Sequence, residues 1–116
     1  MSLPWSNLAG ADVSGNLYKS VAALSVETDE QVIPNGETWH VRLMFANASY
    51  LDDVVVCLCW DYGGAGQEVI ASSHGDMKFQ LDRKLVGDGV KKLAIVLDNA
   101  TPAARVIGVS WYGTLA

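Results

Sequence analysis

The sequence has few of the features that mark membrane-spanning, nucleic-acid-binding or disulfide-stabilised proteins. No segment approaches the roughly 18 consecutive apolar residues needed to cross a bilayer. The opening MSLPWSNLAGADVSG has no charged segment followed by an apolar run, as a secretory signal would. Eight basic residues stand against thirteen acidic ones, and the formal charge of −5 repels nucleic acid. We therefore expect a soluble protein, made in the cytoplasm, that binds neither membrane nor nucleic acid.

Cysteine is also scarce, and the two cysteines stand close together. Cys57 and Cys59 lie in the run VVVCLCW, so in a strand their side chains point to the same face, and a mutual disulfide would strain the backbone. Two thiols are fewer than the four ligands of a structural zinc, and no second Cys or His pair supplies the rest. The sequence predicts buried, reduced core cysteines, which behave as small hydrophobic residues.

What the sequence has in quantity is short apolar segments with a period of two residues. Half of its 116 residues are hydrophobic and 18% are charged, which suits one compact domain that covers some of its apolar surface with other subunits. Helical spacing is hard to find. The expected strands cover residues 18–27, 38–47, 54–61, 67–73, 77–85, 90–99 and 105–114.

This pattern predicts an all-β fold, because short strands alternate with turn residues such as those of IPNGETW and GDG. We expect a single antiparallel β-sandwich or jelly roll of about seven or eight strands. The domain would cover residues 18–116, after an extended N-terminal arm over residues 1–17. Segment 54–61 is apolar on both faces, as expected for a central strand or for one covered by another chain. In segment 38–47 the alternation predicts one face with Trp39, Val41, Leu43 and Phe45, and the other with His40, Arg42 and Met44.

Residues 60–76, WDYGGAGQEVIASSHGD, contain three glycines in four positions and resemble a phosphate-binding loop at first sight. Such a loop needs backbone N–H groups at a helix N-terminus and usually a lysine. Here the glycines lead into QEVIASS, which has neither helical spacing nor a lysine. The stretch therefore predicts a hairpin turn between two strands, with a ligand loop as the alternative.

His74 and Asp76, with Ser72 or Ser73, have the residue types of a nucleophile, a base and an orienting acid. Nearness in sequence does not align such groups, and a Ser-Ser-His-Gly-Asp string between strands is typical of an exposed turn. A hydrolase is therefore the least favoured interpretation, and we expect no enzyme. We expect no cofactor and no metal either: no calcium-binding loop pattern is present, although an ion at an acidic loop tip stays open.

Aromatic residues supply most of the candidate contact residues. Four tryptophans are many for this length, and aromatic side chains line many ligand sites. Trp39, Trp60 and Trp111 have aliphatic neighbours in strand register, which favours packing in the core or at an interface over sugar binding. The candidate interface residues are Trp5, Leu8, His40, Met44, Tyr50, Tyr62, Trp111 and Tyr112.

Four segments in order carry a family resemblance: VIPNGETWHVRLMFANASY, VVVCLCWDYGGAGQEVI, LVGDGVKKLAIVLDNAT and VIGVSWYGTLA, within residues 32–116. A proline-glycine turn before a Trp strand, a GDG turn before an apolar strand ending in Asp-Asn, and a closing GxxWxG-like strand resemble small virion proteins of tailed bacteriophages. The resemblance implies a β-sandwich that assembles by symmetry on a virus particle, as a capsid decoration (cement) protein or a tail, collar or fibre part.

Two functions follow as hypotheses. The first is a structural virion protein, most simply a capsid decoration protein, that forms a trimer or dimer and binds the major capsid or tail protein through its N-terminal arm and one sheet face. The second is a carbohydrate- or receptor-binding β-sandwich of a phage tail or fibre, which would hold a glycan through Tyr50, Tyr62 or Trp111. In both, the protein is located in the virion after synthesis in the host cytoplasm.

Overall fold

The computed structural model describes residues 12–48 and 53–116, and these form eight β-strands and no helix. Predicted strand positions from residue 38 onward agree closely with it. The strands are β1 (Asp12–Val21), β2 (Ser25–Val32), β3 (Thr38–Asn47), β4 (Val54–Trp60), β5 (Glu68–Ser73), β6 (Met77–Val86), β7 (Lys92–Asn99) and β8 (Arg105–Leu115).

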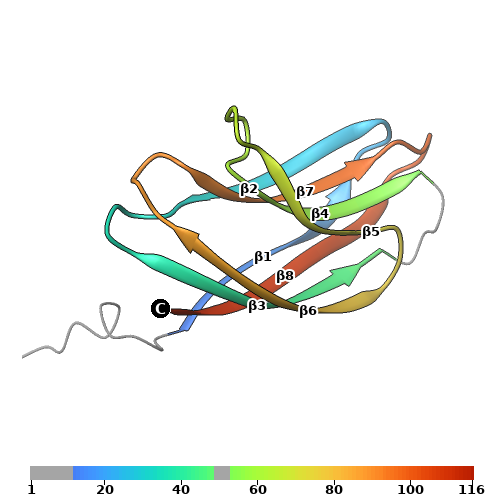
Figure 1. The fold of residues 1–116 in the computed structure, drawn as a ribbon. Helices are drawn as coiled ribbons and strands as arrows, with labels where there is room; N and C mark the ends of the chain where they lie inside the picture. The colour runs from blue at the N-terminus through green and yellow to red at the C-terminus, as the bar shows by residue number, and fades with distance from the viewer. Residues whose placement is uncertain (1–11, 49–52) are drawn as a thin grey trace, which may run out of the picture.

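The strands pair as nested hairpins. β1 pairs with β8, β2 with β7, β3 with β6 and β4 with β5, all antiparallel. Further pairing of β3 with β8 and of β4 with β7 completes two sheets of order β1-β8-β3-β6 and β2-β7-β4-β5, which face each other in Figure 1. This nested arrangement of eight strands is that of a jelly roll. The predicted all-β antiparallel sandwich is confirmed.

The core lies between the inner faces of the two sheets and is built on tryptophan. Trp39 of β3 and Trp111 of β8 are 8% and 1% exposed, and their ring centroids are 5.7 Å apart. Burying a large apolar side chain stabilises a fold by about 1.5–3 kcal/mol. The largest fully buried side chains are Trp111, Ile33, Met44, Leu58, Leu85, Leu93, Ile95, Leu97, Ile107, Val21, Val41 and Val54.

A β-bulge in β3 corrects the predicted alternation of that strand. The register of β3 shifts between Val41 and Leu43 against both β6 and β8. An extra residue in a strand reverses which face the later side chains point to. Met44 is therefore fully buried, while Leu43 and Phe45 are only half-buried. The predicted placement of these three residues was wrong.

The first two strands, β1 and β2, begin and end at other residues than predicted. Residues 12–17, predicted to belong to the arm, form the first part of β1 and pair with residues 109–114 of β8. The predicted strand 18–27 is instead the end of β1, a turn and the start of β2. That turn contains no glycine, proline or asparagine. Leu24 itself adopts the positive φ, of 54°. Positive φ in a leucine is uncommon, so no sequence signal marked this turn.

The turns that carry the family resemblance lie together at one end of the sandwich, on the left of Figure 1. Residues 33–37 connect β2 to β3, and residues 87–91 connect β6 to β7. Gly89 N–H donates to the Ile33 carbonyl at 3.1 Å, and Gly87 N–H donates to the Glu37 carbonyl at 2.8 Å. A Cβ at Gly87 would overlap the Pro34 carbonyl oxygen. The IPNGE and GDG motifs therefore form one packed unit.

A buried amide holds the opposite end of the sandwich together. Asn99, at the end of β7, is fully buried, and its Nδ2 donates to the carbonyls of Val21, Ala22 and Ala103 at 3.0, 3.2 and 2.8 Å. Its Oδ1 accepts hydrogen bonds from the N–H and the hydroxyl of Thr101 at 3.0 and 2.6 Å. One side chain thus ties the β1–β2 turn to the β7–β8 loop.

Candidate functional site

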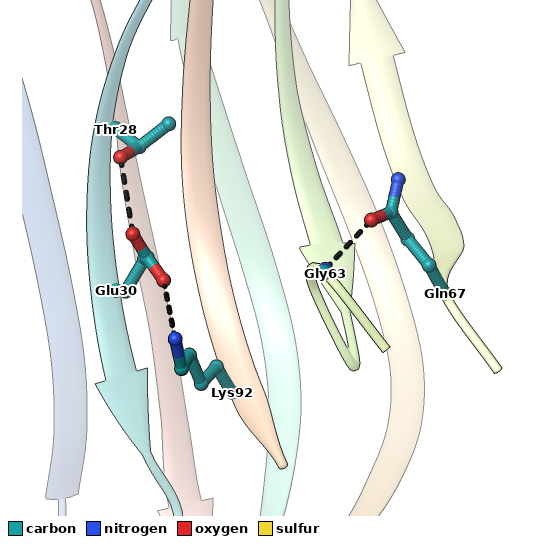
Figure 2. A network of polar contacts seen from close by, with 5 residues as sticks. All are labelled: Thr28, Glu30, Gly63, Gln67 and Lys92. Atoms are coloured by element: carbon teal, nitrogen blue, oxygen red, sulfur yellow. Dashed lines mark hydrogen bonds and ion pairs between the residues drawn. The ribbon is translucent and has the colours of Figure 1, made fainter. Parts of the chain in front are cut away.

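The glycine-rich residues 61–67 form the tip of the β4–β5 hairpin, as the sequence predicts. The Asp61 carboxylate occupies the centre of this loop and accepts the Gly66 N–H at 3.1 Å. The Gln67 side-chain oxygen accepts the Gly63 N–H at 2.8 Å, as Figure 2 shows. The N–H groups of Gly63 and Gly66 already donate to side chains of the loop, and β5 rather than a helix follows. The loop therefore lacks the geometry of a phosphate-binding loop.

The Ser-His-Gly-Asp residues between β5 and β6 make structural contacts. The Nδ1 atom of His74 lies 3.1 Å from the Val54 carbonyl oxygen. An Asp76 carboxylate oxygen accepts the Ala48 N–H at 2.9 Å, and the Ser73 hydroxyl donates to the Gly75 carbonyl at 2.6 Å. Each of these three side chains is thus engaged with backbone atoms, an arrangement that differs from a nucleophile–base–acid chain.

The two cysteines are buried and unbridged, but they lie on the outer face of their sheet. Their side chains share one face of β4, and their sulfur atoms are 3.5 Å apart, within hydrogen-bonding range for sulfur. Burial, with Cys59 beside it, raises the pKa of the Cys57 thiol to about 12. The Cys57 thiol therefore stays protonated. Both cysteines are buried small apolar groups, as predicted, although they do not belong to the core between the sheets.

Around the cysteines, the outer face of the β2-β7-β4-β5 sheet is largely aliphatic. We call this surface the valine face. Its most exposed side chains are Val26 of β2 and Val69 of β5, at 52% and 54%. The strand register places β4 and β7 side chains between them. The valine face consists of Val26, Val55, Cys57, Cys59, Val69, Ala94 and Val96.

A short polar network borders the valine face along β2 and β7 (Figure 2). Lys92 Nζ donates to a Glu30 carboxylate oxygen at 2.9 Å, and the Thr28 hydroxyl donates to the other oxygen at 3.3 Å. The hydrogen bond from Lys92 lowers the pKa of Glu30. Glu30 and Lys92 thus place charges at one border, and Asp98 of β7 places another between Val26 and Val55. Cys57, Cys59, Ala94 and Val96 between these charges are apolar, and apolar groups inside a charged rim are typical of a protein contact surface.

The outer face of the other sheet has a different chemistry over β1 and β8. Tyr18 of β1 and Tyr112 of β8 are 58% and 48% exposed. Between them in the register lie Asn16 and Ser110, and the Ser110 hydroxyl donates to Asn16 Oδ1 at 2.9 Å. We call this surface the tyrosine face, and it consists of Ser14, Asn16, Tyr18, Gly108, Ser110, Tyr112 and Thr114.

Over β3 and β6 the same sheet is charged. His40 Nε2 contacts the Asp82 carboxylate, and the His40 side chain is only 12% exposed. Lys78 Nζ lies 5.9 Å from the ring centroid of Phe45, at cation–π range. Phe45 in turn meets Tyr112 edge-to-face, with centroids 5.9 Å apart. Phe45 thus marks the boundary between the charged half and the tyrosine face.

The predicted contact residues are distributed unevenly over this structure. Met44 and Trp111 are 0% and 1% exposed, so their prediction as interface residues was wrong: the bulge turns Met44 inward, and Trp111 fills the core. His40 and Tyr112 lie on the outer sheet face, and Tyr62 is half-buried in the hairpin tip. Trp5, Leu8 and Tyr50 lie outside the described residues.

Sequence reasoning did not single out Tyr18 or the outward valines. Their signal is weak, because alternation becomes informative only once the strand bounds and pairing are known. Ser14, Asn16 and Tyr18 do share one face of β1, but the glycine and asparagine in that segment suggest a loop.

No protein-family model and no curated protein matches this chain. The likeness to phage virion proteins therefore depends on the motif residues alone. Within residues 12–48 and 53–116, no helix is long and apolar enough to span a membrane. The same residues contain no group of three or more His, Cys, Asp or Glu side chains placed to hold a metal ion.

Proposed function

We propose that this chain is a structural virion protein of a tailed phage, of the capsid decoration type, that acts through protein–protein contacts. The observation that carries the proposal is the nested eight-strand pairing together with the packing of the IPNGE and GDG turns against each other. Jelly rolls are used by viral capsid proteins as well as by lectins. A fold alone does not determine a function, so the surfaces must decide among these uses.

The valine face supports assembly with other protein chains. Val26 and Val69 are about half exposed; the apolar Cys57, Cys59, Ala94 and Val96 lie between them, and Asp98 lies beside Val26. Contiguous apolar surface inside a polar border marks protein contacts, and a stable contact buries about 800 Å² on each partner. In this proposal the valine face is the contact with a second copy or with the capsid or tail protein.

Such a protein would strengthen a particle by binding alone. Each contact adds a modest free energy, and contacts linked on one lattice reinforce each other because a subunit held at one site is concentrated at the next. This requires a rigid subunit more than a reactive one. The engaged side chains of Asp61, His74 and Asp76 agree with that role.

Light scattering after size exclusion tests the oligomeric part of the proposal. The wild-type chain is expected to form a dimer or trimer, and the double variant Val26→Ser, Val69→Ser is expected to dissociate because it removes the most exposed apolar groups of the valine face. The control is Val90→Ser, which changes a 73% exposed valine in the β6–β7 turn. A wild-type monomer at high concentration contradicts oligomer formation through this face.

Binding to particles tests the biological part. Shells that lack this chain are incubated with wild-type chain, the double variant or the Val90→Ser control, and then sedimented. The wild type and the control should co-sediment with the shells, and the double variant should bind more weakly. The proposal fails if the wild type has no affinity for shells or tails. An adjacent major capsid gene would favour a capsid location, and adjacent tail genes would favour a tail part.

A further inference from the structure

The outward surface of β1 and β8 is almost free of charge. The two strands pair in register from Asp12 with Thr114 to Val21 with Arg105, so alternate residues of both strands share the outer face. Among the outward positions only Asp12 has a formal charge. The adjoining β3 and β6 carry charged groups, and Arg42 Nε of β3 donates to the Thr114 hydroxyl at 3.4 Å at one end of this surface. The outward positions are Asp12, Ser14, Asn16, Tyr18 and Ser20 on β1, and Val106, Gly108, Ser110, Tyr112 and Thr114 on β8.

Tyr18 lies against the backbone of the neighbouring strand. Its partner in the register is Gly108, and a Cβ at Gly108 would stand 2.6 Å from Tyr18 Cδ2. The ring therefore occupies the space above Gly108 that a side chain would need. Since Tyr18 is still 58% exposed, the ring is open to solvent on its side away from the sheet.

Tyr112 is supported by Phe45 of the neighbouring strand β3. Phe45 packs against it at an interplanar angle of 79°, which is an edge-to-face contact that fixes ring orientation. Tyr112 keeps 48% of its surface exposed. Two aromatic rings are thus presented on the outer face of one sheet, each supported by a different neighbour.

Polar groups without charge lie between the two rings. Tyr18 pairs with Gly108, Asn16 with Ser110, and Ser14 with Tyr112, so the backbone positions of the two tyrosines are four residues apart along the strands, or about 13 Å. The Asn16–Ser110 hydrogen bond uses Asn16 Oδ1, which leaves the Asn16 amide nitrogen aimed away from that contact. This arrangement offers two stacking surfaces with hydrogen-bonding groups between them.

We propose that the tyrosine face binds a neutral oligosaccharide that lies along β1 and β8 and stacks on Tyr18 and Tyr112. A pyranose ring has an apolar face of C–H groups and a rim of hydroxyls, so it needs an aromatic surface and uncharged donors and acceptors together. Nucleic acid would need a row of cations along the face, whereas the outward positions of β1 and β8 carry none and the Arg42 side chain of β3 contacts the face only at Thr114. Directly linked pyranose rings lie much closer together than the roughly 13 Å between the two tyrosine positions, so a ligand that stacks on both has at least three rings.

This assignment differs from the residues that the sequence suggested for a glycan. Trp111 is buried in the core, and Tyr62 belongs to the hairpin tip. The tyrosine face and the valine face lie on the outer sides of different sheets, so binding of a sugar and assembly with protein use separate surfaces. The two proposals can therefore fail independently.

The test uses an array of immobilised neutral oligosaccharides, from disaccharides to hexasaccharides of hexoses and N-acetylhexosamines, followed by calorimetry with each saccharide that binds. Tyr18→Ala and Tyr112→Ala should each weaken binding about tenfold or more, which corresponds to one stacking contact. Tyr18→Phe should keep most of the affinity, because stacking needs the ring and not the hydroxyl. Tyr62→Ala and Val69→Ser, which change other surfaces, should bind like the wild type.

The tyrosine variants change exposed side chains, so circular dichroism and the unfolding midpoint should show an intact fold. The inference is overturned if no neutral saccharide binds the wild type, or if binding survives both tyrosine-to-alanine changes. It is also overturned if these changes instead abolish self-association or particle binding, because the tyrosine face would then be a protein contact.

Discussion

The indole of Trp111 occupies the space beside Gly15 where any other residue would place its side chain. A Cβ added at Gly15 would overlap Trp111 Nε1 and stand 2.9 Å from Gln31 Nε2. Gly15 pairs with Trp111 in the β1–β8 register, so the glycine and the tryptophan together fill one position of the core layer. This pairing explains a glycine in the middle of a strand, where glycine usually weakens the structure.

Replacing Gly15 with alanine should therefore destabilise the fold. We expect Gly15→Ala to lower the free energy of unfolding by about 1–3 kcal/mol, because the buried indole must shift. Chemical denaturation followed by tryptophan fluorescence measures this. Gly66→Ala is the control, since its Cβ would meet only the Asp61 carboxylate, at 3.0 Å. Equal stability of Gly15→Ala and wild type would contradict the packing described.

The buried amide of Asn99 should be one of the most sensitive polar positions. Asn99→Ala removes the amide group that donates to the carbonyls of Val21, Ala22 and Ala103, and it should cost about 1–3 kcal/mol. The neighbouring Asp98 is exposed, so Asp98→Ala should change stability by less than about 0.5 kcal/mol. Thermal unfolding of the two variants side by side gives the comparison.

The raised pKa of the Cys57 thiol predicts that the folded protein loses stability at high pH. In the unfolded chain a cysteine thiol has a pKa of about 8.5, whereas burial raises the pKa of Cys57 in the folded protein to about 12. Between these values the unfolded state loses a proton that the folded state keeps, so stability falls as pH rises through this window. Cys57→Ala should reduce the slope of the unfolding free energy against pH. A slope unchanged by Cys57→Ala would mean that another group causes it.

Accessibility of the same thiols gives a separate test. The folded protein at pH 8 should react slowly with a thiol reagent, and the chain in denaturant should react quickly, because the thiolate is the reactive form. Both cysteines are less than 10% exposed. Rapid labelling of the native protein would contradict the burial of these side chains.

An ion pair between the two sheets predicts an effect at acid pH. Arg83 of β6 donates to Glu68 of β5, with Nη1 3.2 Å from Oε2, and this hydrogen bond lowers the pKa of Glu68. The contribution of the pair is present above the unfolded carboxyl pKa and is lost as pH falls through the lower folded value. Glu68→Gln should remove this part of the acid dependence, and salt should weaken it in the wild type. Unfolding curves measured between neutral and acid pH check both points.

The β3 strand shows how far the sequence could predict the fold. Trp39 and Val41 alternate inward as expected, and the Asn35-Gly36 turn before them has the positive φ that its sequence requires. After Arg42 the bulge reverses the alternation, so Met44 is in the core and Phe45 is outside. A bulge depends on pairing with β6 and β8, which come from distant parts of the chain. Period-two patterns therefore locate strands better than they assign faces.

The first two strands were predicted least well because their local chemistry contradicts their structure. Gly15 and Asn16 suggest a loop, yet Trp111 and Ser110 of β8 supply the packing and hydrogen bond that these residues need. Leu24 carries a turn that leucine does not favour. The tyrosine face could not be predicted from the sequence either. Tyr18 and Tyr112 are 94 residues apart and share one surface only because β1 pairs with β8.

The pairing of the first and last strands has a practical consequence for engineering. Asp12 lies opposite Thr114, so β1 begins beside the end of β8, its neighbour in the same sheet. A short linker joining them, with a new opening at the exposed β4–β5 hairpin tip, would yield a circular permutant that retains every strand. A cargo fused to the C-terminus would project from the end of the sandwich where the IPNGE and GDG turns lie, because Ala116 N–H donates to the Thr38 carbonyl. That end is opposite the β7–β8 loop, which Asn99 holds in place.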